Sequence, residues 1–327
     1  MKNSFLCLLF SLFIFMTFSP SLLHAQATQT TQKSTGGTTW TWIASDERYG
    51  KFYTPERVRV TTRDSNGTPT CIEAWIKTAY TPAGAAETVP AMNLTKEIPN
   101  PAVLSYSLAF IEINPQGRTL DYKEEIFYDK NGNVLVSHKY AQPRLKEINS
   151  QSFDENFYDA IVDQVFGKGE TARTKANDRW ITLWRQINAG MASSSTADTT
   201  TIRKRGDDVF VWIWQETRNN STSAVTQINF YKKVFNLATY SYKLTSYSSW
   251  TAADKWQDQN ATLTGQYISI VPDSKEDMEF RIIKQYVADH PDWVNRYQPV
   301  ETKPAAPANT NAQSAAVPPV PASSDTL

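Results

Sequence analysis

The chain has 327 residues, a length that suits about two ordinary domains. It carries 33 basic and 33 acidic side chains, and this balance argues against nucleic acid or an anionic membrane surface as its partner. Ten tryptophans, 15 tyrosines and 15 phenylalanines offer aromatic contact surface instead.

The N-terminal segment is typical of a secretory signal peptide. Met1-Lys2-Asn3 precedes an apolar run over residues 5–18, and Ala25-Gln26-Ala27 fits the small-residue cleavage rule. The run is too short to favour a membrane span. We therefore expect a signal peptide over residues 1–27, a flexible leader over 28–39, and export to the periplasm, the cell surface or the extracellular space.

Removal of the signal peptide would leave Cys71 as the only thiol, so an intramolecular disulfide is not expected. Cys71 falls in an alternating apolar stretch that predicts a strand. A free cysteine in such a place is usually small, buried and inert. We expect a poorly reactive thiol and a monomeric protein.

A turn glycine followed by a strand with a tryptophan characterises the first half. After Gly67, apolar side chains alternate with others along residues 72–77, which is the pattern of a half-buried strand. The face opposite the apolar side chains would carry Glu73, Trp75 and Lys77. Because charges flank the tryptophan there, this face is a candidate partner-binding surface.

The same spacing occurs again in the second half. Gly206 precedes Trp214 by eight residues, as Gly67 precedes Trp75. Residues 209–214 are apolar on both faces, which predicts a strand covered on both sides.

Two tryptophans before this second hairpin give conflicting signals. Trp180 and Trp184 are spaced for a helix, whereas Trp42, in the matching place of the first half, lies in a strand pattern. The sequence does not decide whether Trp180 and Trp184 lie in a helix or in a strand.

A capped amphipathic helix is predicted near the end of each half. Ser152 with Glu155 predicts the start of the first helix, and Gly167 predicts its end. Ser274 predicts the start of the second helix. Apolar residues recur at 6, 9 and 13 positions after each serine. Pro291 is expected to end the second helix.

The repeated hairpin and the repeated helix occur in the same order, which predicts an α+β fold of two tandem modules. Each module would be an antiparallel β-sheet with one C-terminal helix packed on it. We expect the modules over residues 40–168 and 169–298. A long loop over residues 79–103 would occur in the first module alone. A disordered Pro/Ala-rich tail would follow over residues 299–327.

No arrangement typical of catalysis is visible. His138 and His290 have no positioned partner residues, and Asp129-x-Asn131-x-Asn133 lacks the glycine that a calcium loop needs. We therefore expect a protein that is not an enzyme, with no catalytic residues, no cofactor and no metal.

The order of elements resembles the surface-adhesin protein E family, with Trp42 and Trp75 matching its layout in the first half and Trp184 and Trp214 in the second. The family prototype has a disulfide between helix and sheet, whereas this chain without its predicted signal peptide has only Cys71. The resemblance implies a small exported module that binds host matrix proteins.

Three hypotheses for function follow from the sequence. The first is an exported, non-enzymatic binding or adhesion protein. It would contact a macromolecule, such as an extracellular-matrix protein or a glycan, through Trp75, Glu73 and Lys77. The second is a periplasmic structural or assembly factor of the envelope, and the third is an enzyme whose site is not visible in the sequence.

Overall fold

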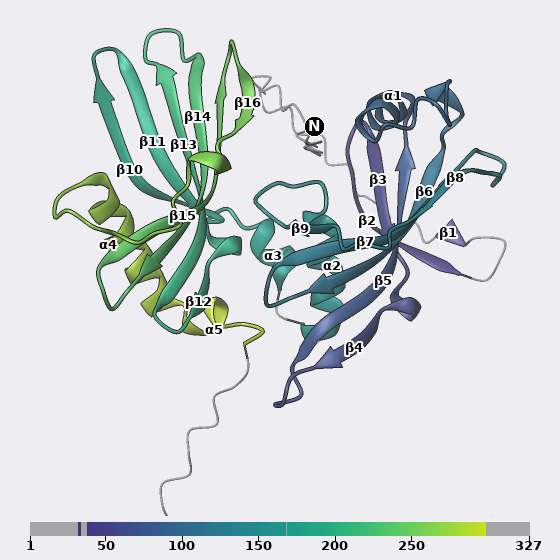
Figure 1. Cartoon of the computed structure of the whole chain (residues 1–327), viewed down its shortest axis with the longest axis horizontal. Helices are drawn as coiled ribbons and strands as arrows, with labels where there is room; N and C mark the ends of the chain where they lie inside the picture. Colours follow the sequence, from purple (N-terminus) through teal and green to yellow (C-terminus); the bar gives the residue numbers. More distant parts are fainter. Residues whose placement is uncertain (1–31, 34–37, 168, 299–327) are drawn as a thin grey trace, which may run out of the picture.

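The computed structural model describes residues 32–33, 38–167 and 169–298, which form two antiparallel β-sheets with helices (Figure 1). The predicted α+β fold of two tandem modules is confirmed. The predicted signal peptide and Pro/Ala-rich tail lie outside the described residues. Within the expected flexible leader, Gln32–Lys33 pairs with the next strand as β1.

The first sheet has nine strands within the described residues, in the order β1-β2-β3-β5-β6-β7-β8, with β4 beside β5 and β9 beside β7. Its further strands are β2 (Thr39–Ser45), β3 (Tyr49–Tyr53), β4 (Arg59–Arg63), β5 (Pro69–Tyr80), β6 (Tyr106–Asn114), β7 (Thr119–Tyr128), β8 (Val134–Lys139) and β9 (Leu145–Glu147). The helices that accompany it are η1 (Pro55–Arg57), α1 (Pro82–Ala91), η2 (Pro101–Val103), α2 (Glu155–Phe166) and α3 (Glu170–Thr174).

The second sheet has eight strands within the described residues, in the order β10-β11-β13-β14-β15-β16, with β12 beside β13 and β17 beside β15. These strands are β10 (Trp180–Asn188), β11 (Met191–Asp198), β12 (Arg203–Arg205), β13 (Asp208–Asn219), β14 (Val225–Asn236), β15 (Ser241–Thr251), β16 (Lys255–Asp258) and β17 (Ile268–Ser269). The helices that accompany it are η3 (Thr199–Thr201), η4 (Asn260–Thr262), α4 (Lys275–Asp289) and α5 (Pro291–Val294).

The two sheets share one connectivity, since β2–β9 of the first correspond in order to β10–β17 of the second. Irregularities in pairing also correspond. The bulge at Lys123 of β7, opposite Phe110 and Ile111, matches the bulge at Thr245 of β15, opposite Lys232 and Lys233. Arg118 and Tyr240, each just before the strand that follows, both have a left-handed backbone, with φ of 51° and 50°.

Strand pairing aligns Trp75 with Trp212 rather than with Trp214. Trp75 pairs with Phe110 and Trp212 pairs with Lys232, and those partners occupy equivalent bulge positions. The eight-residue spacing from glycine to tryptophan therefore finds the correct two hairpins but aligns them two residues out of register.

Three local expectations differ from the structure. The segment expected as a loop over residues 79–103 contains α1, whose N-cap Thr81 accepts a hydrogen bond from the Gly84 amide. The first predicted helix starts at Glu155 rather than at Ser152, because Asp154 is its N-cap. Trp180 and Trp184 both lie in β10 and not in a helix.

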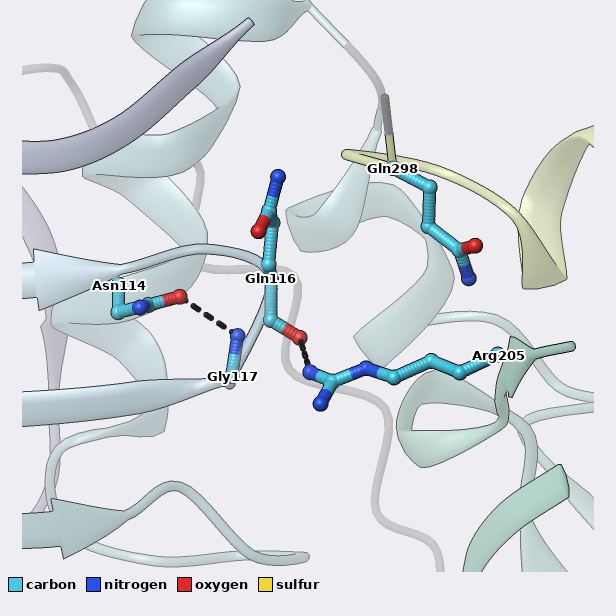
Figure 2. A pocket seen from close by; sticks show the side chains of 5 residues that line it. All are labelled: Asn114, Gln116, Gly117, Arg205 and Gln298. Atoms are coloured by element: carbon cyan, nitrogen blue, oxygen red, sulfur yellow. Dashed lines mark hydrogen bonds between the residues drawn. The ribbon is translucent and has the colours of Figure 1, made fainter. Parts of the chain in front are cut away.

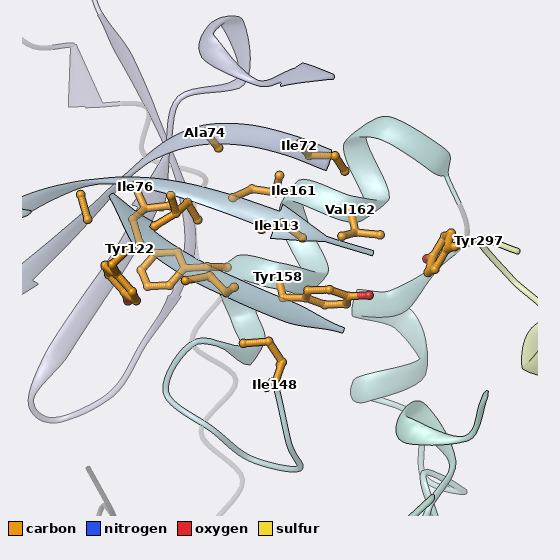
Figure 3. Close-up of a cluster of buried hydrophobic side chains, with 14 residues drawn as sticks. Ile72, Ala74, Ile76, Ile113, Tyr122, Ile148, Tyr158, Ile161, Val162 and Tyr297 are labelled. Carbon is orange, nitrogen blue, oxygen red and sulfur yellow. The ribbon is translucent and has the colours of Figure 1, made fainter. Parts of the chain in front are cut away.

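Each module buries its core between its sheet and its closing helix. In the first, Ile72, Ala74 and Ile76 of β5 face Ile161 and Val162 of α2 (Figure 3). The second module packs α4 on its own sheet in the same manner, with Val211, Ile213, Phe280 and Ile283 among its core residues. The second helix starts as expected, since Ser274 accepts a hydrogen bond from the Asp277 amide.

A buried carboxylate ties α4 to the second sheet. Glu279 is fully buried and accepts hydrogen bonds from Trp184, Ser195 and Gln215 at 2.9 to 3.3 Å. Its second oxygen lies 2.6 Å from Nζ of Lys233, which is also buried. Four donors from four strands thus converge on one helix residue.

We predict that Glu279→Ala lowers the free energy of unfolding by about 3–5 kcal/mol, because it leaves the buried charge of Lys233 without a partner. Chemical denaturation checks this value. Asp289→Ala, which removes an exposed acid from the same helix, is the matched control and should stay within about 0.5 kcal/mol of the wild type. An equal effect of both substitutions would contradict the assigned role of Glu279.

A network of buried charges joins the two modules, which lie side by side with α2 and α3 between them in Figure 1. Glu155 of α2 accepts hydrogen bonds from Arg118 of the first module and from Arg179 of the second, each at 2.9 Å. Arg179 also reaches Asp198 at 2.7 Å. These four side chains are all buried, so each charge depends on its partners for solvation.

Glu170, at the start of α3, is the second centre of this network and is fully buried. Arg118, Arg203 and Arg296 form ion pairs with it at 3.3, 3.4 and 2.5 Å. The hydroxyl of Tyr297 donates to it at 2.8 Å. The ring of Tyr297 belongs to the core of the first module, so the end of the described chain returns to the first sheet.

Asp159 of α2 lies beside this network. Burial raises its pKa to about 7, and the positive charge of Arg118, with the hydrogen bond from Thr174, only partly offsets that effect. Its ordinary value is 3.8. Between these two values the unfolded chain is ionised while the folded protein retains the proton, so stability falls as the pH rises through this window.

We predict that Asp159→Asn removes part of the loss of stability between about pH 4 and pH 7, since a neutral amide does not titrate. The difference between wild type and variant should change by up to about 1.4 kcal/mol per pH unit inside the window and stay constant above it. Urea denaturation at a series of pH values measures this difference. If the free energies of unfolding of the two proteins change in parallel with pH, the role assigned to Asp159 is wrong.

Candidate partner-binding surface

The three residues expected to form a site lie together on the face of the first sheet that points away from α2. Ile72, Ala74 and Ile76 are fully or almost fully buried, whereas Glu73, Trp75 and Lys77 between them are partly exposed. The alternation of β5 therefore places these three side chains on one face, as the sequence predicts. Their role as a binding site stays a prediction.

Aromatic side chains from neighbouring strands extend this surface. Trp75 lies against Phe110 of β6, with ring centroids 5.4 Å apart. Tyr106 stacks on Tyr128 of β7 at 4.7 Å. Trp42 of β2 is 40% exposed and pairs in register with Phe52 of β3, which is partly exposed as well.

We call this surface the open face. It includes the partly or fully exposed side chains that strand pairing places on the outer side of β2, β3, β5, β6 and β7: Trp42, Phe52, Glu73, Trp75, Lys77, Tyr106, Leu108, Phe110, Glu112, Glu124, Ile126 and Tyr128.

The charges on the open face are few and closely held. Nζ of Lys77 lies 4.8 Å from the centre of the Tyr106 ring and 5.8 Å from that of Phe52. Burial lowers the pKa of Lys77. Glu73 pairs in register with Arg59 of β4 and with Glu112 of β6. The face is thus mainly aromatic and apolar, with Lys77 and the acidic side chains Glu73, Glu112 and Glu124 available to orient a partner.

The corresponding face of the second sheet is partly covered by the first module. Trp212, the counterpart of Trp75, is 6% exposed. Its indole nitrogen donates to Glu147 of β9 at 3.2 Å, and the same carboxylate lies 2.5 Å from Nζ of Lys232. The expectation that β13 is covered on both faces thus holds for Trp212, while Phe210 and Trp214 remain partly exposed.

Further aromatic residues lie beyond this contact on the second sheet. Trp214 makes edge contacts with Phe230 and Trp256, at 5.8 and 6.0 Å between ring centroids. Trp250 pairs in register with Trp256. All three tryptophans are partly exposed, but they pack on one another and on the sheet.

A small polar cavity marks the junction of the modules. Figure 2 shows its lining, which is formed by Asn114, Gln116, Gly117, Arg205 and Gln298, and its volume is about 330 Å³. Arg205 of the second module donates to the Gln116 carbonyl at 2.5 Å, and Asn114 accepts from the Gly117 amide at 2.7 Å. Since the charged and amide groups here hold the modules together, we assign the cavity to the inter-module contact.

The residues considered for catalysis have other contacts. His138 stacks on Tyr140 and His290 on Tyr286, with ring centroids 6.3 and 4.2 Å apart. Burial raises the pKa of the Cys71 thiol, which lowers the fraction of reactive thiolate.

Within residues 32–33, 38–167 and 169–298, no group of histidine, cysteine, aspartate and glutamate side chains is placed to hold a metal ion. No helix in the same part of the chain is long and apolar enough to cross a membrane.

Comparison with known proteins gives no relative from which a function can be transferred. No protein-family model matches the chain, and no curated protein matches its sequence. Function must therefore be argued from the surfaces of this molecule.

We predict that Trp212→Ala lowers the free energy of unfolding by about 3–5 kcal/mol, whereas Trp75→Ala lowers it by only about 1–2 kcal/mol. The two tryptophans are structural counterparts, but only Trp212 is buried against the other module. Thermal and chemical denaturation of both variants test this. A Trp75→Ala variant that fails to fold would show that Trp75 belongs to the core, and the site assignment would then be wrong.

Proposed function

We propose that this protein is an exported, non-enzymatic binding protein that contacts a macromolecular partner through the open face. The observation that carries the proposal is the gathering of partly exposed aromatic side chains across five strands, on a face away from the closing helix. A monomeric soluble domain rarely leaves such apolar surface in water unless something binds there. Tryptophan and tyrosine are also the side chains that contribute most at protein interfaces.

The second sheet supports this use of the face. At the position of Trp75, Trp212 already binds another protein surface, since it packs on the first module beside Glu147. The fold is therefore able to use this face for protein contact. Zero net charge fits a partner held by aromatic and hydrogen-bond contacts rather than by salt-sensitive attraction.

The resemblance to surface-adhesin protein E modules makes extracellular-matrix proteins and glycans the first partners to test. In this proposal Trp75 and Phe110 anchor the partner, while Glu73 and Lys77 orient it. The N-terminal sequence supports export, with a location in the periplasm, at the cell surface or outside the cell.

We predict that Trp75→Ala and Phe110→Ala each weaken binding by about 10- to 100-fold, as expected when a central aromatic anchor is removed. Binding of the mature protein to immobilised matrix proteins and to a glycan array provides the measurement, and circular dichroism verifies folding. Trp250→Ala is the matched control, because it removes a partly exposed tryptophan from the other sheet.

Three outcomes would count against the proposal. Loss of binding in Trp250→Ala but not in Trp75→Ala would move the site to the second sheet. Binding that none of the three substitutions changes would exclude the open face. No binding to any matrix protein or glycan, with an envelope assembly defect on deletion of the gene, would favour the structural or assembly factor instead.

A further inference from the structure

The contact between the two modules uses different surfaces on each side. The first module contributes the turn between β6 and β7, with Gln116, and the edge strand β9, with Glu147. The second contributes the outer face of its sheet, with Trp212 and Lys232, and Arg205 of β12. Because the modules share one connectivity, each module has both kinds of surface.

Within one chain, each kind of surface is used only once. The open face of the first module corresponds to the face of the second sheet around Trp212, which the first module covers. The turn between β14 and β15, together with β17, corresponds to the turn and edge strand that cover it. We call this second region the tail edge and define it by residues 237–240 and 267–271.

The tail edge exposes apolar side chains. Tyr267, Ile268 and Val271 are 40%, 52% and 67% exposed, which places them among the most exposed large hydrophobic side chains of the described residues. Ile270 between them is buried and its amide donates to the Tyr240 carbonyl, as the Ile148 amide donates to the Arg118 carbonyl in the first module. The tail edge therefore has the backbone geometry of the edge that binds Trp212.

At the position of the ion pair between Glu147 and Lys232, both unused surfaces are neutral. The pairing of β17 with β15 and of β9 with β7 makes Ser269 the counterpart of Glu147. Strand pairing likewise makes Phe110 the counterpart of Lys232. The ion pair between Glu147 and Lys232 is thus replaced on both sides at once by neutral residues, and neither surface would bury an unpaired charge at this position.

We infer that a second copy of this chain binds the open face with its tail edge, so that molecules associate head to tail. The inference rests on the proposed function, since it identifies one partner of the same face. A contact between two different surfaces leaves one of each free at the ends, so assembly continues into short filaments unless it closes into a ring.

The association between copies should be weaker than the contact within the chain. Arg179 and Asp198, which contribute to the buried charge network, have Thr39 and Thr54 as counterparts in the first module. The new contact therefore lacks that part of the network, and no peptide linker holds the surfaces close together. It should depend on protein concentration.

Sedimentation velocity of the mature protein from about 1 μM to about 500 μM, a range that brackets weak self-association, tests the inference. The mean mass of the wild type should rise with concentration. Ile268→Asp and Trp75→Ala should each shift that rise to at least about tenfold higher concentration. Ile187→Asp, a similar change at an exposed residue of β10, should behave as the wild type. A wild type that stays monomeric over the whole range would overturn the inference.

An exchange of charges tests the register of the contact. Phe110→Lys and Ser269→Glu each place one charge on one surface, so each variant alone should associate more weakly than the wild type. At concentrations too low for the wild type to associate, an equimolar mixture should form one-to-one dimers, because the two new charges can pair as Lys232 and Glu147 do, and salt should weaken these dimers. A mixture that remains monomeric would refute head-to-tail contact. So would a dimer that forms equally well when Ile268→Asp is added to the Ser269→Glu variant.

The same variants separate this inference from the proposed function. Ile268→Asp should lose self-association but keep binding to a matrix protein or glycan, whereas Trp75→Ala should lose both. Partner binding without self-association would leave the proposed function intact and overturn the inference. Self-association without binding to any foreign macromolecule would support the inference and overturn the proposed binding of a foreign partner. The open face would then serve assembly alone.

Discussion

The arrangement of the whole molecule depends on the buried charges between the modules. Glu155 is held by one arginine from each module, and Glu170 by three arginines and a tyrosine hydroxyl. None of these groups has much contact with water, so each carboxylate would be costly to bury without its arginines. Because ion pairs of this kind need close geometry, they fix the orientation of the two sheets more tightly than an apolar contact would. The position of Trp212 against the first module follows from that orientation.

This orientation decides which of two equivalent surfaces is available. Trp75 and Trp212 occupy the same place in the fold, yet one is partly exposed and the other is buried. The difference does not come from the strands, which share their order and the bulge opposite the partner of each tryptophan. It comes from the neighbour that the charge network brings to one face and not to the other. The surface that is bound within the chain in the second module is thus left open in the first.

Much of the fold could be predicted from local patterns. The alternation of residues 72–77 correctly placed Trp75 opposite the core, and Ser274 correctly marked the start of α4. The predictions failed where a local signal was ambiguous. The spacing of four between Trp180 and Trp184 fits one face of a helix and one face of a regular strand equally well, and the bulge after Thr182 that places them on opposite faces of β10 has no local signal. The helix α1 was missed since prolines and alanines are also typical of loops.

The contact surface on the second sheet could not be predicted, for a different reason. Trp212 is buried by Glu147, which lies 65 residues earlier in the chain, and only the folded orientation brings them together. Likewise, single residues such as Glu170 and Arg296 carry no pattern that reveals a partner 126 residues away. Periodicity reports which face of a strand is covered, but it does not report what covers it.

The position of Tyr297 has a consequence for how the chain reaches this fold. Its ring packs beside Phe166 in the first core, with centroids 4.4 Å apart, and its hydroxyl binds Glu170. The core of the earlier module is therefore completed by a residue near the end of the described chain. A ribosome would synthesise the first sheet and its helix long before this side chain emerges. The first core can therefore be fully packed only once the chain through Tyr297 is present and this tyrosine lies against Phe166. Completion of the fold is thus a late step that involves both modules.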